Sequence, residues 1–334
     1  MFKQQTIAAA VIITVLTAAC NGNRVQPALA PGAGDSMTPV LHSGPAITGP
    51  VNPSTAMAKL QNVRRDLRAP WMSQPALVGS ALLYVSDPGT DDVNVYSYKA
   101  QKIGALVGQL TGFNLPQGLC SDGQHVWITN TLNQTVDEYA PGGTAPINVL
   151  QVGQYYPVDC SFDPTTGNLA VTDIQSTSGA AGNIALFALA KGAPTYFYSS
   201  TIYRYYFASF DNSGNLWFDG QANSTGTPFS FAELEKNANS ATAVALNQPI
   251  DFPGSVQWDG THVVVADQND SDAYQFAMSG GDGTRVHTTH FKAATDVAQF
   301  VIDPQTTAAF GPDATKARVV AYGLVFPNGA TIVR

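Results

Sequence analysis

Short apolar runs that end on an acid or an amide recur along the chain from about residue 71. One example is the stretch 169–173 (LAVTD), and another is 263–267 (VVVAD). The end residues are spaced 43, 43, 46, 48 and 46 apart: Asp87, Asn130, Asp173, Asp219, Asp267 and Asp313. A run of four or five apolar or β-branched residues is typical of a strand. The regular interval predicts six repeats of a unit of about 44 residues between 71 and 334.

Three further elements accompany each run. A strand that closes on Asp and a turn precedes most copies, as at Asp122-Gly123 and Asp163-Pro164, which is hairpin chemistry. A strand with a central aromatic residue follows each copy, and a fourth short β-run completes most units. A single four-stranded unit leaves both of its faces bare, whereas units stacked in a closed ring cover one another. We therefore expect an all-β, six-bladed β-propeller of four-stranded blades over residues 71–334. The first unit lacks an obvious innermost strand, which residues 71–77 or another closure of the termini would supply.

The repeats resemble a known class of propellers. The stretches NLAVTD, HVVVAD and LLYVSD, each followed by an aromatic-centred strand, resemble the NHL-type and YVTN-type bacterial propellers. The longer pattern DPTTGNLAVTD…VQWDG…GPDA is similar to a secreted group of these bacterial propellers. The resemblance covers 71–334 and implies the fold, but it leaves the function open because propellers serve as enzymes, receptors and scaffolds.

The N-terminus carries an export pattern. Lys3 precedes the apolar run 7–19, which is too short to span a bilayer as a permanent helix. The run ends on Thr17-Ala18-Ala19-Cys20, which resembles a bacterial lipobox with its leucine one position early. We expect residues 1–20 to be a lipoprotein-type signal and Cys20 to be lipidated, with ordinary cleavage after 28–30 (ALA) as the alternative.

Composition predicts the nature of residues 21–70, and with the export pattern it predicts where the protein resides in the cell. Residues 21–70 are rich in Pro, Gly, Ala, Ser and Thr, and they predict a flexible linker with a short helix at about 56–67. The protein is then an exported lipoprotein of the bacterial cell envelope, or a secreted protein, that meets the membrane only through its lipid anchor. Only 16 of 334 residues are Lys or Arg and the net charge is −8, which argues against nucleic acid as a partner.

Candidate chemistry is sparse. The six residues that end the runs have two interpretations: they bind backbone N–H groups of the next turn, which we favour, or they ring an opening that holds a cation. Asp159, on a predicted innermost strand, is the best candidate for an ionisable residue in the central channel. We expect no bound cofactor, with a divalent cation such as calcium as the alternative.

The glutamates of this chain are not placed as they are in metal-dependent propeller enzymes. Lactonase-like and lyase-like propellers place a glutamate, with Asn and Asp or with His, at the channel mouth. The three glutamates here, Glu138, Glu233 and Glu235, all fall on predicted third strands, away from the centre. We therefore assign no catalytic residue.

Two cysteines other than Cys20 lie on successive predicted inner strands. Cys120 and Cys160 stand two and three residues before the turn aspartates of their units. In an exported protein they are candidates for a disulfide; the alternative is a pair of small buried thiols.

The stretch 196–207 holds seven aromatic residues in twelve positions, and Tyr155-Tyr156 lies one unit earlier. Tyr203, Tyr205 and Tyr206 are candidate ligand-binding residues, and packing between blades is the alternative.

The leading functional hypothesis is a non-catalytic binding module at the cell envelope, with an envelope protein or a polysaccharide as partner. The alternatives are a metal-dependent lactonase, lyase or hydrolase with its site in the channel, and a carbohydrate-binding propeller. The oligomeric state is left open.

Overall fold

The computed structural model describes most of the repeat region and little of the N-terminal part. The described residues are 11–13, 69–73, 81–99, 102–291, 299–302, 308–313, 318–325 and 329–333. Cys20 and the predicted helix at 56–67 lie outside them. Within these ranges the chain forms strands and two short 3-10 turns, η1 (Thr131–Asn133) and η2 (Ala188–Ala190), and no α-helix. No helix in this part of the chain is long and apolar enough to cross a membrane.

The described strands form six sheets, which we label A to F in chain order of their inner parts. Sheet A has the order β1-β3-β4-β5-β2: Val11–Ile13, Ala81–Asp87, Asp92–Lys99, Lys102–Leu110 and Trp71–Met72. Sheet B comprises β6 to β9: Pro116–Ser121, Val126–Asn130, Thr135–Tyr139 and Asn148–Gln151. Sheet C comprises β10 to β13: Tyr155–Phe162, Leu169–Ser176, Ala181–Phe187 and Thr195–Phe197.

The other three sheets repeat this plan. Sheet D comprises β14 to β17: Arg204–Phe210, Leu216–Gln221, Phe229–Leu234 and Thr242–Ala243. Sheet E has the order β19-β20-β21-β22-β18: Pro253–Trp258, Val263–Asp267, Asp272–Ser279, Asp282–His290 and Ala245–Leu246. Sheet F comprises β23 to β26: Val301–Ile302, Ala308–Asp313, Arg318–Val325 and Gly329–Val333.

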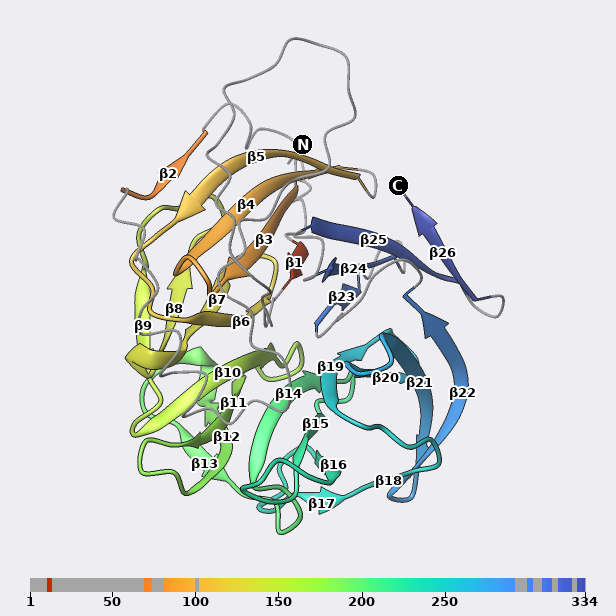
Figure 1. Ribbon diagram of the computed structural model, residues 1–334. Coiled ribbons are helices and arrows are strands. Elements are labelled where there is room, and N and C mark those ends of the chain that lie inside the picture. Colours follow the sequence, from red (N-terminus) through yellow and green to blue (C-terminus); the bar gives the residue numbers. More distant parts are fainter. Residues whose placement is uncertain are drawn as a thin grey trace, which may run out of the picture.

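The sheets are arranged radially around a common centre (Figure 1). Strands β6, β10, β14, β19 and β23 lie nearest the centre, and successive strands of each sheet run outward from them. Each of these inner strands is antiparallel to the second strand of its sheet. This is the arrangement of a β-propeller, as the repeat predicted.

Apolar layers between neighbouring sheets hold the arrangement together. Between sheets B and C, Trp127 packs with Val171 and Phe187. Between sheets D and E, Phe231 packs with Val256 and Phe276 in the same way. Because both faces of a sheet are covered, its second strand is buried at every position rather than at alternate ones, as along β11. This explains why the sequences of the second strands are continuous apolar runs.

The inner strands are bulged near the centre. The pairing of the first two strands is interrupted in sheets B, C, D and E, between Pro116 and Leu119 in the first of them. The bulge brings the backbone of one inner strand against the next. A Cβ atom on Gly118 would lie 2.3 Å from the Cα of Asp159, so only glycine fits there.

Sheet A shows how the position left open in the first unit is filled. Trp71 and Met72 do not form its innermost strand: they pair with Gln109 and Gly108 on the outer strand β5. The side chain of Met72 reaches the apolar layer between sheets A and B, and Gly108 leaves room for it. The innermost position is taken by β1, which runs parallel to β3.

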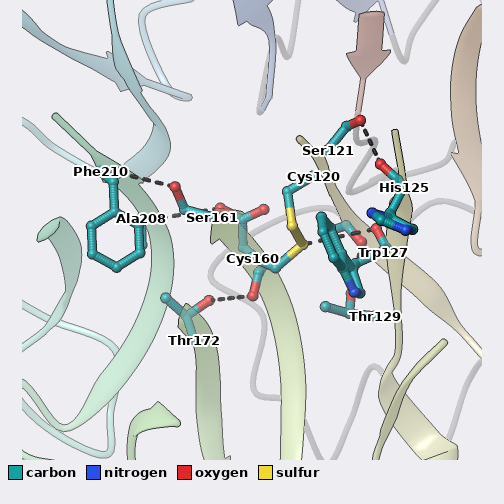
Figure 2. Close-up of a disulfide and its surroundings, with 12 residues drawn as sticks. Cys120, Ser121, His125, Trp127, Thr129, Cys160, Ser161, Thr172, Ala208 and Phe210 are labelled. Atoms are coloured by element: carbon teal, nitrogen blue, oxygen red, sulfur yellow. Dashed lines mark hydrogen bonds between the residues drawn. A yellow bond between two sulfur atoms is a disulfide. The ribbon is translucent and has the colours of Figure 1, made fainter. Parts of the chain in front are cut away.

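A disulfide joins the inner strands of sheets B and C. Cys120 on β6 and Cys160 on β10 are bonded, with their Cα atoms 5.6 Å apart (Figure 2). Ser161, next to Cys160, accepts the N–H of Phe210 at 2.9 Å and so links sheet C to sheet D. The two cysteines named as a candidate pair are thus bonded, and the bond joins β6 to β10.

The disulfide leads to a stability prediction. The bond closes a loop with a sequence separation of 40 residues, and a cross-link of this span stabilises a fold by about 4 kcal/mol through the unfolded state. We expect the Cys120→Ala/Cys160→Ala double variant to lose roughly this free energy of unfolding in denaturant titrations. Dithiothreitol should lower the stability of the parent protein and leave that of the double variant unchanged. Equal effects of the reductant on both proteins would contradict the role assigned to the bond.

Candidate functional site

Asp159 lies at the centre of the molecule but does not face open space. Its side chain is 5% exposed, and its Oδ2 atom accepts the N–H of Ala208 on β14 at 3.1 Å. Burial raises the pKa of Asp159 to about 8, against the opposing effect of the N–H groups of Ala208 and Cys160. Asp159 therefore links sheet C to the bulge of sheet D through a hydrogen bond, which is a structural role.

A second carboxyl group meets the same bulge from the other side. Asp219 on β15 accepts the N–H of Phe207 at 2.9 Å through Oδ1. Burial raises the pKa of Asp219 well above its usual value, and the neighbouring charge of Asp159 raises it further. Two buried carboxyl groups thus receive successive N–H groups that the bulge frees from the ladder, and burial raises the pKa of both.

Three of the predicted repeat residues accept backbone N–H groups, and for Asp87 and Asp267 a donor lies in the turn that follows the strand. Asp87 accepts from Gly89 at 2.9 Å, and Asn130 accepts from Asn114 at 2.8 Å. Asp267 accepts from Asp251 at 2.7 Å and from Asn269 at 3.0 Å. The side chain of Asp313 lies outside the described part of the structure.

Asp219 does not belong to this set, which corrects the sequence alignment of the repeats. Asn130 and Asp173 pair with Pro116 and Pro157, whereas Gly220 takes the corresponding place opposite Tyr205. Asp219 falls one position earlier, where sheets B and C have Thr129 and Thr172. With Gly220 at the repeat position, the intervals on either side of it become equal, at 47 residues each.

Asp173 holds the repeat position but lacks the repeat's contacts. Strand β11 continues past Asp173 to Ser176, whereas β3 and β20 end at Asp87 and Asp267, so Asp173 lies farther from the turn that follows its strand. Both carboxyl oxygens of Asp173, and both side-chain polar atoms of the opposed Asn183, have no hydrogen-bond partner among the described residues. Burial raises the pKa of Asp173 well above the usual range. Asp173 is therefore a fully buried acid on β11 whose surroundings disfavour the charged form.

One group of acids has the spacing of a cation site. Carboxyl oxygens of Asp251, Asp267 and Asp270 lie within 4.8 Å of one another, with Asp267 buried and the other two exposed. Carboxylate oxygens are the ligands that calcium prefers. Asp267 is already bound by backbone N–H groups, which gives it a structural role in the fold.

Three tyrosines form a partly exposed surface at the junction of sheets B and C, which we call the tyrosine surface: Tyr155, Tyr196 and Tyr198. The hydroxyls of Tyr155 and Tyr198 are 3.2 Å apart, and the ring centroids of Tyr155 and Tyr196 are 5.4 Å apart. Tyr196 donates to the carbonyl of Val152 in sheet B at 3.1 Å. Tyr198 is 52% exposed, so one ring of an otherwise fixed group faces solvent.

The electrostatics of the tyrosine surface keep it uncharged. The hydrogen bond with Tyr155, followed by partial burial, raises the pKa of Tyr198 to about 12. Burial raises the pKa of Tyr196, and the Asp173 carboxyl and Tyr155 add to this effect. At neutral pH the tyrosine surface therefore offers hydroxyl groups and ring faces, with a hydrogen-bonding rather than an ionic character.

The predicted ligand-binding tyrosines lie elsewhere and are mostly packed inside. Tyr205 is 0% exposed, and its ring stacks on Phe218 with centroids 5.7 Å apart. Tyr206 is buried and donates to Gln221 at 2.9 Å. Tyr203 is partly exposed and donates to the carbonyl of Gly179 at 2.7 Å, which ties down the long hairpin after β11. Rings inside the wedge between sheets are not available to a ligand in solution.

A sequence signal for the tyrosine surface was present. Tyr196 lies on β13 and Tyr198 directly follows its last residue, Phe197, and side chains two residues apart along an extended segment point to the same side. The partner, Tyr155, comes from the start of the same sheet, and the Tyr155–Tyr198 contact depends on how β10 to β13 are ordered. For Asn183 the sequence contains no such signal, because its place opposite Asp173 follows only from the pairing of β11 with β12.

The buried carboxyl groups lead to a pH prediction. An acid whose pKa is raised on folding binds a proton that the unfolded chain releases from about pH 4 upward. The stability it contributes is complete below that pH and is lost as pH rises toward the folded pKa, which is about 8 for Asp159. We expect the free energy of unfolding to fall between pH 5 and pH 8.

The variant Asp159→Asn tests the assignment. Its amide oxygen can still accept the N–H of Ala208 but does not titrate, so the slope with pH should decrease by up to about 1.4 kcal/mol per unit. Denaturant titrations at several pH values measure the slope, and the exposed Asp282→Asn is the control. An unchanged slope in Asp159→Asn would show that Asp159 is not protonated in the folded protein.

Comparison with known proteins gives structural likeness but no family. No protein-family model matches the chain, and no curated protein matches it. Among solved structures, a chain in the crystal structure of a nidogen/laminin complex is similar, with 12% sequence identity and a TM-score of 0.48. The match covers 73% of this chain and 95% of that chain. The chain is thus not assigned to a family, and the geometry described above is the basis for its proposed function.

Proposed function

We propose that this protein is an exported six-bladed β-propeller that acts as a non-catalytic binding module at the bacterial cell envelope. In this proposal residues 1–20 are the export signal, Cys20 carries a lipid, 21–70 are a tether and 71–334 form the closed ring. The lipobox-like residues before Cys20 support the anchor, and the six radial sheets support the ring. A tether that holds a rigid body near a surface raises the local concentration of a binding site there.

The tyrosine surface is the observation that carries the proposed binding function. Tyrosine combines a large ring with a polar hydroxyl and loses little conformational freedom on binding, and it is enriched where proteins bind partners. Here the contacts of Tyr155 and Tyr196 fix their positions before any ligand arrives. A fixed, uncharged surface with one exposed ring suits an envelope protein or a polysaccharide.

A carbohydrate ligand is the second candidate, and one observation favours it. The exposed ring of Tyr198 is flanked by the hydroxyl of Tyr155, and sugars are bound by ring faces together with hydroxyl groups. A panel of purified envelope polysaccharides distinguishes the two ligand classes. Saturable binding to one polysaccharide identifies the carbohydrate candidate, and binding only to protein-containing envelope fragments identifies the protein candidate.

The binding proposal predicts the effect of Tyr198→Ala. The variant removes the exposed ring and should reduce binding to isolated envelope fragments at least tenfold, with the melting temperature unchanged because the side chain is 52% exposed. Co-sedimentation measures the binding and calorimetry the melting temperature. Val286→Ala, which is exposed on sheet E, is the matched control and should bind as the parent does. Equal binding by Tyr198→Ala and the parent would refute the assignment of the surface.

Tyr205→Ala should show the opposite pattern. The variant leaves a cavity between sheets where a fully buried ring stacks on Phe218. It should cost roughly 3–5 kcal/mol of stability, measured by denaturant titration below its new melting temperature. Binding per folded molecule should remain that of the parent protein. A loss of binding with unchanged stability would restore Tyr205 as a ligand residue.

The anchor is tested separately. In a bacterial host, Cys20→Ala removes the only atom that a lipid would modify in the lipobox-like sequence. We expect the parent to fractionate with membranes and to incorporate a labelled fatty acid, and the variant to do neither. Labelling of both proteins would contradict modification at Cys20.

A further inference from the structure

The innermost position of sheet A is filled in a different way from that of the other sheets. In sheets B to F the inner strand is antiparallel to the second strand and directly precedes it in the chain. In sheet A the position is held by β1 (Val11–Ile13), which comes from far upstream and runs parallel to β3. Its register is Val11 with Leu83, Ile12 with Tyr84 and Ile13 with Val85.

The position of β1 is central. In addition to β3, β1 contacts β6 of sheet B and β23 and β24 of sheet F. It lies near the middle of the ring, where sheets A, B and F converge (Figure 1). The residues of β3 opposite it are fully buried: Leu83, Tyr84 and Val85 are each 0% exposed. An extended segment at this position therefore completes both a backbone ladder and an apolar environment.

The same three residues fall inside the segment that carries the export pattern. The apolar run 7–19 contains β1, and a signal removed at Cys20 would take β1 with it. The inner edge of β3 would then expose backbone N–H and C=O groups beside buried apolar side chains. Unpaired groups at a strand edge are a template for another strand.

The linker is a poor replacement for β1. Between residues 21 and 70 the sequence contains no three consecutive residues from Val, Ile and Leu. It carries seven prolines, at 27, 31, 39, 45, 50, 53 and 70, and proline cannot donate to a ladder. The linker therefore offers no segment like Val11-Ile12-Ile13, and an extended segment of a partner protein is a candidate to fill the position.

We propose that the inner edge of β3 is a docking slot for an extended, β-branched segment of a partner protein, which adds to sheet A as a parallel strand once residues 1–20 are removed. The proposal rests on the proposed export of the chain. Main-chain hydrogen bonds to β3 supply affinity, and the apolar surroundings select Val and Ile over charged residues. Val11–Ile13 occupies the slot in the unprocessed chain and acts as an internal competitor.

The experiment uses a fluorescent synthetic peptide with the sequence of residues 8–16 (AAAVIITVL), extended by lysines for solubility, and fluorescence anisotropy. Three proteins are compared: the full chain, the full chain with Ile12→Pro, and the chain lacking residues 1–20. Proline at position 12 removes a backbone donor from β1 and should empty the slot without deleting any of the chain. The control is the same peptide with proline at the position of Ile12.

We expect saturable binding to the shortened chain and to the Ile12→Pro chain, and at least tenfold weaker binding to the full chain. The peptide should also raise the melting temperature of the shortened chain, and the proline peptide should do neither. Absence of saturable binding to the shortened chain, or equal binding to all three proteins, would overturn the proposal. Tyr198→Ala in the shortened chain should leave peptide binding intact, so a failure of the slot and a failure of the tyrosine surface give different results.

Discussion

Hydrogen bonds from one sheet to the inner strand of the next are the constraint on which this arrangement depends. Ser86 donates to the carbonyl of Gln117 at 2.7 Å, and Thr131 donates to that of Pro157 at 2.7 Å. Thr172 donates to Tyr206 at 2.7 Å, and Ser255 donates to Phe300 at 2.9 Å. Apolar burial holds the sheets against one another but has no direction, whereas these bonds fix the relative positions of sheets A and B, B and C, C and D, and E and F. The acceptors become available because the inner strands depart from regular pairing near the centre.

Asp159 and Asp219 belong to the same system and explain why acids are tolerated at the centre. Each accepts an N–H group of sheet D, and a carboxyl group that can be neutral avoids most of the cost of burying a charge. Two adjacent negative charges would repel in such surroundings, so protonation and packing support each other. Their location, which first indicated channel chemistry, is accounted for by the way sheets C, D and E meet.

The repeat made the strands, their order within a unit and the radial arrangement predictable, because burial on both faces leaves a continuous apolar run in every copy. The shift at Asp219 was not predictable, since a tyrosine replaces the proline that marks the register in sheets B and C. The tyrosine surface was only partly predictable. Local composition identified the aromatic stretch, but it does not show that both faces of β14 are covered, so that Tyr205 and Tyr206 are both buried. Tyr155 joins the tyrosine surface only through the folding of the whole of sheet C. The filling of the first inner position came from outside the repeat, where periodicity gives no information.

The bonds between sheets use a side-chain hydroxyl on one side and a main-chain carbonyl on the other. The interaction involves only the backbone carbonyl of the accepting residue. The accepting residues therefore share no side-chain chemistry: they are Gln117, Pro157, Tyr206 and Phe300. These four bonds therefore place no demand on the side chains of the accepting residues, and substitutions there leave the bonds intact. Such tolerance lets the sequences of the units diverge during evolution while these junctions keep their geometry.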